Sequence, residues 1–387
     1  MQKLGPIKRI ITMTNEWFTN EKYKRNCIDM IRDAGYETEI WNVNKVVFSA
    51  ESIPDVPNDL YQGEVPVKNF ESREELREEL RKYRPDSLIL NWYADWSATV
   101  DICEEKVRYC NMACAPMLAD RYLEGLDEYY KKRTLFYLIR QLWVEINGSR
   151  RNKKQAIIKQ WPPIYNFAAT PAEYTPVCRL SSKNRMKFIH HIDYDKYILD
   201  TDREPRDGGY ILFIDEAWGI HPEEKSLGWT FSTTELSYYY ELMKKLFIIL
   251  ENYYNKRVII AAHPKAEYGK NEFGNREIHQ FQTYELIKNS SFVILHSSTV
   301  VDWVFLFDKP CLQVTYGKMN QYMGSAINRF QSYCELETFD LEKNNNPWDY
   351  LFYDKKIYQR YLHDFVVTDE ADTRLYMKVV LDEIRKI

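Results

Sequence analysis

The chain has 387 residues, of which 45% are hydrophobic and 28% are charged. This length is sufficient for two ordinary domains with separate cores, and the composition is that of a globular protein. The 57 acidic and 53 basic residues give a formal net charge of −4, so no overall positive field would recruit nucleic acid or an anionic membrane.

Cysteine content and the N-terminus indicate the compartment. The seven cysteines lack the density of a disulfide scaffold and the paired spacing of a structural zinc site, so we expect reduced thiols in a cytoplasm. The first apolar run, residues 10–13, is too short for a signal peptide or a membrane span. We therefore expect a cytoplasmic protein without a transmembrane segment, and peripheral contact with a membrane stays open.

The first half of the chain alternates strands and helices. Gly35 separates a predicted helix from the strand after it, which is typical of a βαβ unit with a parallel sheet. The periodicity fades in a Pro-rich stretch at 161–176, so we place the N-terminal domain and its linker at 1–200. The predicted elements are a strand at 9–13, a helix at 20–34, a strand at 37–43, a helix at 72–83, a strand at 87–90 and a long helix at 123–146.

The second half restarts the same alternation with stronger signals, which predicts a second parallel sheet in a domain at 201–370. A closing helix at 371–387 has apolar residues at helical spacing, and we expect it to cross back toward the N-terminal domain. The predicted elements are strands at 210–214, 258–262, 292–295 and 311–315, and helices at 234–254, with Ser232 or Thr233 as N-cap, at 277–289 and at 300–307.

Ligands of open parallel sheets bind beyond the carboxyl ends of the strands, so the residues directly after each strand are the candidates for chemistry. Three of these positions carry polar clusters. They are Asp215-Glu216-Ala217, His263-Pro264-Lys265 and His296-Ser297-Ser298-Thr299.

Each cluster admits a chemical role and a structural one. Ser297, Ser298 and Thr299 precede a predicted helix, where hydroxyls and main-chain N–H groups could hold a phosphate or simply cap the helix. His263 could donate a proton to a leaving phosphate oxygen, or be a satisfied structural histidine. Asp215 or Glu216 could accept a proton from an attacking hydroxyl; adjacent side chains on an extended segment point opposite ways, so we expect only one to face a ligand.

The order Asp-Glu-Ala, His-Pro, Ser-Ser-Thr resembles the bacterial CMP-sugar transferases of the GT-B type, which include sialyltransferases, polysialyltransferases and Kdo transferases. These enzymes carry an acidic pair followed by Gly, then His-Pro, then Ser-Ser or Ser-Thr. The resemblance covers about residues 205–320, and Ala217 departs from it where the family usually has Gly. His-Pro followed by Ser-Ser-Thr is also similar to GT-B teichoic-acid polymerases, which use CDP-activated alcohols.

The resemblance implies an α/β fold with two Rossmann-like domains and a central cleft. It implies a glycosyltransferase of bacterial surface polysaccharide synthesis, with a nucleotide-sugar donor, favoured as a CMP-linked sialic or related nonulosonic or octulosonic acid, and a glycan acceptor. Asp215 would be the general base, with Glu216 as its substitute, and His263 would assist departure of CMP. Pro264 belongs to the phosphate-binding motif, and Ser297, Ser298 and Thr299 would bind the phosphate.

No metal or other cofactor is expected, because hydroxyls, a helix N-terminus and an imidazole could neutralise the single phosphate of CMP. The competing motif is Asp193-Tyr194-Asp195, beside His190 and His191, which could hold a divalent metal or be a polar segment between domains.

An aromatic cluster follows the strand at 87–90. Trp92, Tyr93, Asp95 and Trp96 are placed to contact an acceptor sugar, and core packing is the alternative reading. No Gly-rich dinucleotide fingerprint or Walker loop follows any strand, which disfavours an NAD enzyme or an ATPase. Two alternatives stay open: a GT-B transferase with a UDP- or CDP-linked donor, and a non-catalytic protein that binds carbohydrate or nucleotide.

Overall fold

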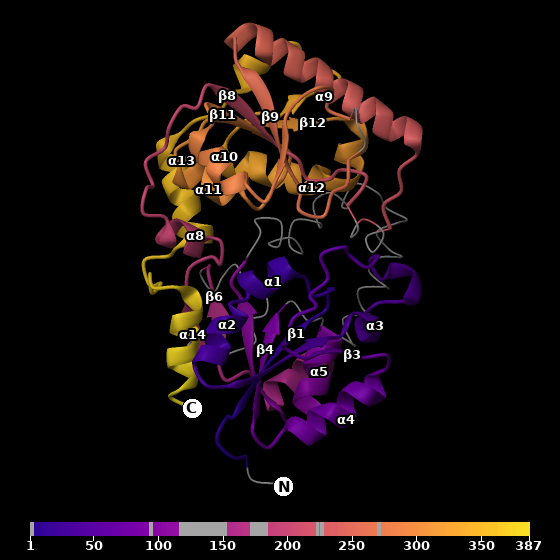
Figure 1. The fold of residues 1–387 in the computed structure, drawn as a ribbon, viewed down its shortest axis with the longest axis vertical. Coiled ribbons are helices and arrows are strands. Elements are labelled where there is room, and N and C mark those ends of the chain that lie inside the picture. The colour runs from indigo at the N-terminus through magenta and orange to yellow at the C-terminus, as the bar shows by residue number, and fades with distance from the viewer. Residues whose placement is uncertain are drawn as a thin grey trace. The chain divides into compact units, whose positions relative to one another are not determined.

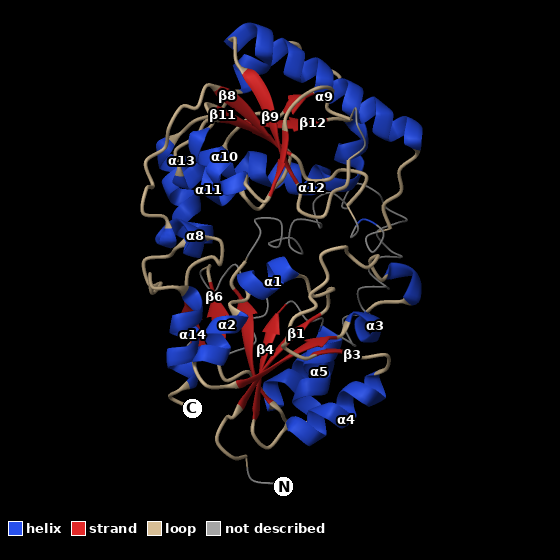
Figure 2. Ribbon diagram, in the orientation of Figure 1, coloured by secondary structure: helices blue, strands red, loops and turns tan. Residues whose placement is uncertain are grey.

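The computed structural model describes residues 4–92, 96–115, 153–170, 185–221, 224, 228–268 and 272–387. The chain divides into two units (Figure 1). Unit 1 comprises Met1–Ile192 with Val367–Ile387, and unit 2 comprises Asp193–Val366. Each unit has its own sheet with helices around it (Figure 2). The helix predicted at 123–146 lies outside the described residues.

Unit 1 has a seven-stranded parallel sheet in the order β3-β2-β1-β4-β5-β6-β7. Strand β1 is an interior strand, and its apolar side chains, such as Ile10 and Ile11, are fully buried, as is typical of a parallel sheet covered on both faces. The strands are β1 Arg9–Thr14, β2 Glu37–Asn42, β3 Val67–Asn69, β4 Ser87–Trp92, β5 Arg108–Ala113, β6 Asn166–Ala168 and β7 Met186–Phe188.

The helices of unit 1 differ from the prediction at two points. The closing helix expected at 371–387 spans only Tyr376–Ile384. The helix expected at 20–34 is interrupted at Cys27, whose φ of 50° is left-handed and cannot continue an α-helix. Ser72 caps α4 by accepting a hydrogen bond from Glu75 N, and Leu76 and Leu80 are its buried residues. The helices are α1 Asn20–Arg25, α2 Ile28–Asp33, α3 Asn44–Val47, α4 Arg73–Tyr83, α5 Trp96–Glu104 and α14 Tyr376–Ile384.

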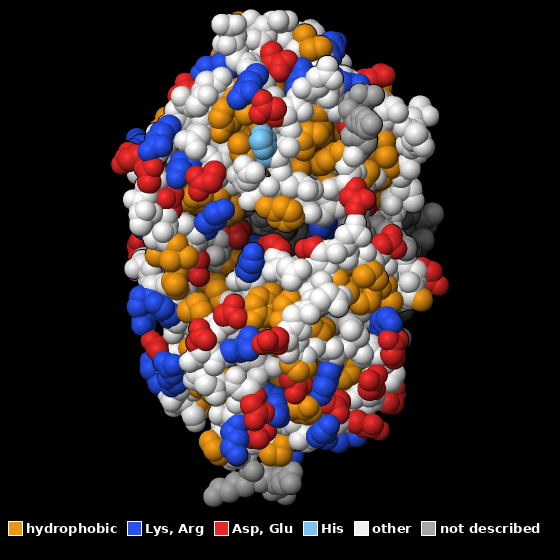
Figure 3. Space-filling model, viewed as in Figure 1, with side chains coloured by type: hydrophobic (Ala, Val, Ile, Leu, Met, Phe, Trp, Pro, Cys, Tyr) orange, Lys and Arg blue, Asp and Glu red, His pale blue; other side chains and the backbone are white. Residues whose placement is uncertain are grey.

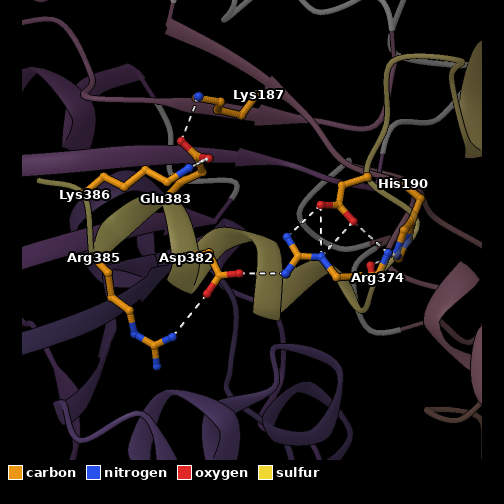
Figure 4. A network of polar contacts seen from close by, with 8 residues as sticks. Lys187, His190, Arg374, Asp382, Glu383, Arg385 and Lys386 are labelled. Atoms are coloured by element: carbon orange, nitrogen blue, oxygen red, sulfur yellow. Dashed lines mark hydrogen bonds and ion pairs between the residues drawn. The ribbon is translucent and has the colours of Figure 1, made fainter.

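The C-terminal helix α14 completes the core of unit 1. It packs against α2, and its buried side chains, Met377 and Val380 among them, join the same apolar cluster as Ile10 of β1. Figure 4 shows the polar contacts around it. The His190 imidazole lies 2.8 Å from the carbonyl oxygen of Arg374, and Lys187 forms a 2.7 Å ion pair with Glu383. The C-terminal residues are therefore an integral part of unit 1.

Unit 2 has a six-stranded parallel sheet in the order β10-β9-β8-β11-β12-β13. The chain adds β9 on one side of β8 and later adds β11 on the other side. The carboxyl ends of β8 and β11 therefore flank a topological switch point, where ligands bind in sheets of this kind. The strands are β8 Tyr210–Ile214, β9 Arg257–Ala262, β10 Ile278–Gln280, β11 Phe292–Leu295, β12 Cys311–Thr315 and β13 Phe339–Asp340.

The helices of unit 2 confirm most of the predicted boundaries. Ser232 caps α9, and its hydroxyl and the Glu235 carboxylate form a reciprocal capping box. The helix expected at 277–289 begins only at Thr283, because residues 278–280 pair with β9 as an edge strand. The helices are α8 Tyr194–Leu199, α9 Thr233–Tyr254, α10 Thr283–Asn289, α11 Val301–Leu306, α12 Gly317–Cys334 and α13 Lys355–Tyr361.

The surface is mixed in charge. On the face shown in Figure 3, acidic and basic side chains lie interspersed, as the small net charge suggests. Within the described part of the chain, no helix combines the length and the apolar character that crossing a bilayer requires.

Candidate active site

The three predicted clusters follow three adjacent strands of unit 2. Strands β9, β8 and β11 lie side by side and parallel, so the residues after them meet at one edge of the sheet. The main-chain N–H of Asp215 still donates to the carbonyl oxygen of Ala261, at 3.0 Å. The acidic cluster is therefore held between the His263 cluster on one side and the Ser297 cluster on the other.

Asp215 is buried, with 3% of its surface exposed, and its carboxylate is firmly oriented. One carboxylate oxygen, Oδ2, accepts a hydrogen bond from Ala217 N at 3.0 Å and another from the hydroxyl of Tyr268. Burial raises the pKa of Asp215 to about 6, while these hydrogen bonds act in the opposite direction. A carboxyl group with this pKa can hold or release a proton near neutral pH.

Glu216 points to the other side, toward β11. Its Oε1 atom accepts hydrogen bonds from the main-chain N–H groups of His296, at 3.2 Å, and Ser297, at 2.7 Å. Burial, with the neighbouring charge of Asp215, raises the pKa of Glu216 to about 8. A carboxyl group of the protein itself thus occupies main-chain donors at the position where the sequence predicted a phosphate.

His263 follows β9, and its neutral tautomer is set by the main chain. Its Nδ1 atom accepts a hydrogen bond from Lys265 N at 3.2 Å, so in the neutral ring the proton is on Nε2. The ring of His221 packs edge-on against it, with a centroid separation of 4.6 Å and an interplanar angle of 68°. Pro264 is exposed and lies two residues beyond the end of β9. The site therefore contains two adjacent imidazoles rather than one.

Glu224 is a third carboxyl group at this edge. It is buried, and its Oε1 atom accepts a hydrogen bond from Gly219 N at 2.8 Å. Burial raises its pKa to about 7. Glu224 thereby fixes the main chain at Gly219, two residues before His221.

The cluster after β11 separates into a structural residue and three hydroxyl side chains. His296 is fully buried; its ring contacts the carbonyl oxygen of Val314 at 2.8 Å and the hydroxyl of Tyr239 at 2.9 Å. Burial lowers its pKa to about 4, so the imidazole is neutral and acts in packing. Ser297, Ser298 and Thr299 are only partly buried.

The structure does not have these hydroxyl residues at the N-cap position of the following helix, where the alternative reading expected them. Helix α11 begins at Val301, with Val300 at the N-cap position, so neither Ser298 nor Thr299 is the cap residue. The hydroxyl oxygen of Ser298 does accept a hydrogen bond from Val300 N, at 3.4 Å. Asp302, in the first turn of α11, is buried and accepts a hydrogen bond from Tyr361.

The aromatic cluster after β4 requires a correction. Trp92 is 2% exposed and packs edge-to-face on Tyr376 in the core of unit 1, with ring centroids 6.2 Å apart. A buried indole has no face for a sugar, so core packing is the correct reading for Trp92. Tyr93 and Asp95 lie outside the described residues, and so does the side chain of Trp96, the first residue of α5.

The alternative metal motif, Asp193-Tyr194-Asp195 beside His190 and His191, makes contacts within the protein. The carbonyl oxygen of Asp193 accepts a hydrogen bond from the indole of Trp303, and α8 begins at Tyr194. His190 lies between the carbonyl oxygens of His191 and Arg374. Among the described residues, no three His, Cys, Asp or Glu side chains are grouped so as to hold a metal ion.

Three residues of the site were not predicted from the sequence: His221, Glu224 and Tyr268. A signal for His221 was present, since His221-Pro222 repeats the His-Pro dipeptide that singled out His263. Tyr268 and Glu224 follow their strands at a distance, and only the folded loops bring them to Asp215 and Gly219.

The comparisons place the fold among known structures. No profile of a known protein family matches the chain, and no curated protein sequence matches it. The calicheamicin glycosyltransferase CalG4 superposes with a TM-score of 0.54 at 10% identity, over 100% of this chain and 98% of that one. The wall teichoic acid polymerase TagF superposes with a TM-score of 0.50 at 11% identity, over 99% of this chain and 90% of that one.

These similarities, together with the two parallel sheets of seven and six strands, confirm the predicted α/β fold with two Rossmann-like units, as in GT-B glycosyltransferases. At 10–11% identity the likeness is one of fold.

Proposed function

We propose that this protein is a glycosyltransferase that transfers a sugar from a nucleotide-sugar donor to a glycan acceptor. The favoured donor is a CMP-linked sialic acid or a related nonulosonic or octulosonic acid, and the favoured process is the synthesis of a bacterial surface polysaccharide. One observation carries the proposal: the acidic, His-Pro and Ser-Ser-Thr clusters follow three adjacent strands, beside the switch point of unit 2.

In this proposal, Asp215 is the general base. Its carboxylate is oriented by Ala217 N–H and Tyr268, and its pKa of about 6 suits proton transfer near neutral pH. Glu216 is the substitute, although its carboxylate is engaged by two main-chain N–H groups.

His263 is proposed to assist departure of the donor phosphate. The neutral ring presents its Nε2–H as a hydrogen-bond donor, because Nδ1 is engaged by Lys265 N. Ser297, Ser298 and Thr299 are proposed to supply hydroxyl groups to the same phosphate. Such donors stabilise the charge that develops on a leaving phosphate.

The donor class is tested by calorimetric titration of the protein with CMP, CDP, UDP and ADP. We expect CMP to bind most tightly. Tighter binding of UDP or CDP would replace the CMP-linked donor by the alternative one. Turnover, measured as release of the nucleotide from its sugar in the presence of a glycan, separates a transferase from a protein that only binds.

A paired substitution tests the phosphate contacts. Replacing Ser297 and Ser298 together with Ala should weaken CMP binding, since each lost hydrogen bond to a charged group is worth about 1.5–3 kcal/mol. The thermal unfolding temperature should stay near that of the wild type. Unchanged affinity with a lower unfolding temperature would show that the hydroxyls serve the fold alone.

A further inference from the structure

We infer that His221 is a second phosphate-binding side chain, and that the donor phosphate is held by the imidazoles of His221 and His263 together. This inference rests on the proposed function, since it names the residues that would receive the phosphate of the nucleotide. It adds a residue outside the three clusters that the sequence indicated. The carrying observation is the contact between the two rings, whose centroids lie 4.6 Å apart.

The loop after β8 is built to bring His221 to this place. Ala217 and Gly219 both have a positive φ, of 56° and 80°, so the chain turns sharply directly after the acidic pair. Ile220 N donates to the carbonyl oxygen of Ala217 at 2.9 Å, and Glu224 N donates to that of His221 at 3.0 Å. The described residues 217–221 thus form a folded turn.

Two further contacts fix this loop against the rest of unit 2. The buried carboxyl group of Glu224 accepts the N–H of Gly219 at 2.8 Å. Gly219 also passes so close to α9 that an added Cβ would lie 2.0 Å from the side chain of Leu236. The main chain is therefore held in place at Gly219, two residues before His221.

The acceptor-rich surroundings of the site favour a second hydrogen-bond donor for the phosphate. A nucleotide phosphate would enter an edge of the sheet that already carries the carboxyl groups of Asp215, Glu216 and Glu224. One imidazole offers the phosphate a single N–H donor, whereas two imidazoles in contact can offer two. Two N–H donors on one oxyanion would fix its position better than one.

The test compares CMP with cytidine, which lacks the phosphate, in calorimetric titrations of the full chain. His221→Gln and His263→Gln should each weaken CMP binding by about 10-fold to 100-fold, the loss expected for one hydrogen bond to a charged group. Cytidine binding should be unaffected. The double variant should lose less than the product of the two single losses, because both rings would serve one phosphate.

The matched control is His279→Gln. His279 lies in the edge strand β10 of the same unit, and its ring is 3.4 Å from Glu277 rather than beside His263. This variant should bind CMP as the wild type does. Thermal unfolding of each variant shows whether it is folded, and His221→Asn serves as a second variant if Gln is not tolerated.

A second readout does not depend on the identity of the nucleotide. Inorganic phosphate is titrated into the wild type while the ring carbons of its seven histidines are followed by NMR. Signals assigned to His221 and His263 by substitution should move together. Movement of the His263 signal alone, or a CMP affinity unchanged in His221→Gln, would overturn the inference and leave the proposed function standing. Joint movement with phosphate but no binding of any nucleotide would support the paired site and overturn the proposed function.

Discussion

The carboxylate of Glu216 accepts a 2.7 Å hydrogen bond from the main-chain N–H of Ser297, across the switch point between β8 and β11. The same oxygen accepts the N–H of His296 at 3.2 Å. Consecutive main-chain N–H groups of this kind form a natural seat for an anion. Here the seat is filled by an acidic side chain of the protein, so a phosphate that binds there must displace it.

Removal of this side chain should therefore improve phosphate binding. We expect Glu216→Ala to bind CMP several-fold to about tenfold more tightly than the wild type, because the two N–H groups are then available to the ligand. Glu216→Gln is the matched control, since its side-chain oxygen can still accept both hydrogen bonds. Calorimetric titration gives both affinities, and weaker binding by the Ala variant would show that the phosphate does not use this seat.

The proposed chemistry predicts distinct defects at its two principal residues. Asp215→Asn and His263→Ala should each lower turnover by about 10²–10⁴-fold, the usual contribution of a general acid or base. A donor with a better leaving group should partly rescue the histidine variant, whose defect falls on departure, and leave the aspartate variant impaired. Near-wild-type turnover of Asp215→Asn would move the base to Glu216 or to the region of Asp193.

The hydrogen bond from Tyr268 should influence the pKa of Asp215. Its hydroxyl donates to the Asp215 carboxylate and so favours the ionised form, opposing the burial that raises the pKa to about 6. Tyr268→Phe should therefore raise the pKa of Asp215 further, by about one unit.

The shift can be measured directly from the carboxyl carbon of Asp215 by NMR. If turnover is observed, the acidic limb of its pH profile should move to higher pH by the same amount, because a higher pH is then needed to ionise the base. Tyr238→Phe is a suitable control, since that exposed hydroxyl bonds to Glu342 instead. An unchanged Asp215 pKa would remove Tyr268 from the site.

The main-chain conformation of Ala217 predicts a gain in stability. Its φ is 56°, a left-handed value that costs an L-residue about 1–2 kcal/mol. Ala217→Gly removes this strain and adds chain entropy to the unfolded state, worth about 0.4–1 kcal/mol, so the net gain should be about 0.5–1 kcal/mol in the free energy of unfolding.

At Gly219, two residues later, we expect the opposite effect, a loss of stability when a side chain is added. Its φ is 80°, and a Cβ there would lie 2.0 Å from Leu236, so Gly219→Ala should destabilise the protein. Denaturant unfolding of both variants tests the pair. A loss of stability in Ala217→Gly would contradict the left-handed conformation described for that residue.

The packing of α14 predicts that the C-terminal segment contributes strongly to stability. Met377 is fully buried in the core of unit 1, so Met377→Ala should cost about 2–5 kcal/mol in the free energy of unfolding. Lys378→Ala, at the exposed neighbouring position, should change it by less than about 0.5 kcal/mol. Equal, small effects of the two substitutions would place α14 outside the core.

Much of the fold could be predicted because its signals are local. The buried strands at 210–214 and 292–295 are continuous apolar runs, and Ser232 with Glu235 forms a capping box that can be recognised from spacing alone. The break at Cys27 could not be predicted, because the apolar spacing continues across it. Residues 278–280 were included in the helix predicted at 277–289. Their pairing with β9 is a long-range contact, which local sequence patterns do not indicate.

The candidate site was predicted only in part for the same reason. Strand-end placement indicated Asp215, His263 and Ser297, since parallel strands bring their carboxyl ends to one edge. The engagement of Glu216 by main-chain N–H groups and the contact of His221 with His263 depend on how two loops fold back. Trp92 was ambiguous because an aromatic run after a strand fits a core as well as a sugar, and burial decides between the two.

The division of unit 1 into two sequence segments has a consequence for synthesis on the ribosome. Residues 193–366 emerge as one uninterrupted stretch that contains all of unit 2, whereas the core of unit 1 needs α14, which is translated after all of unit 2. Domains fold as units during translation, N-terminal ones usually first. In this chain the order is reversed: the unit that starts first is completed last, and until α14 arrives its apolar surface is exposed to chaperones and proteases.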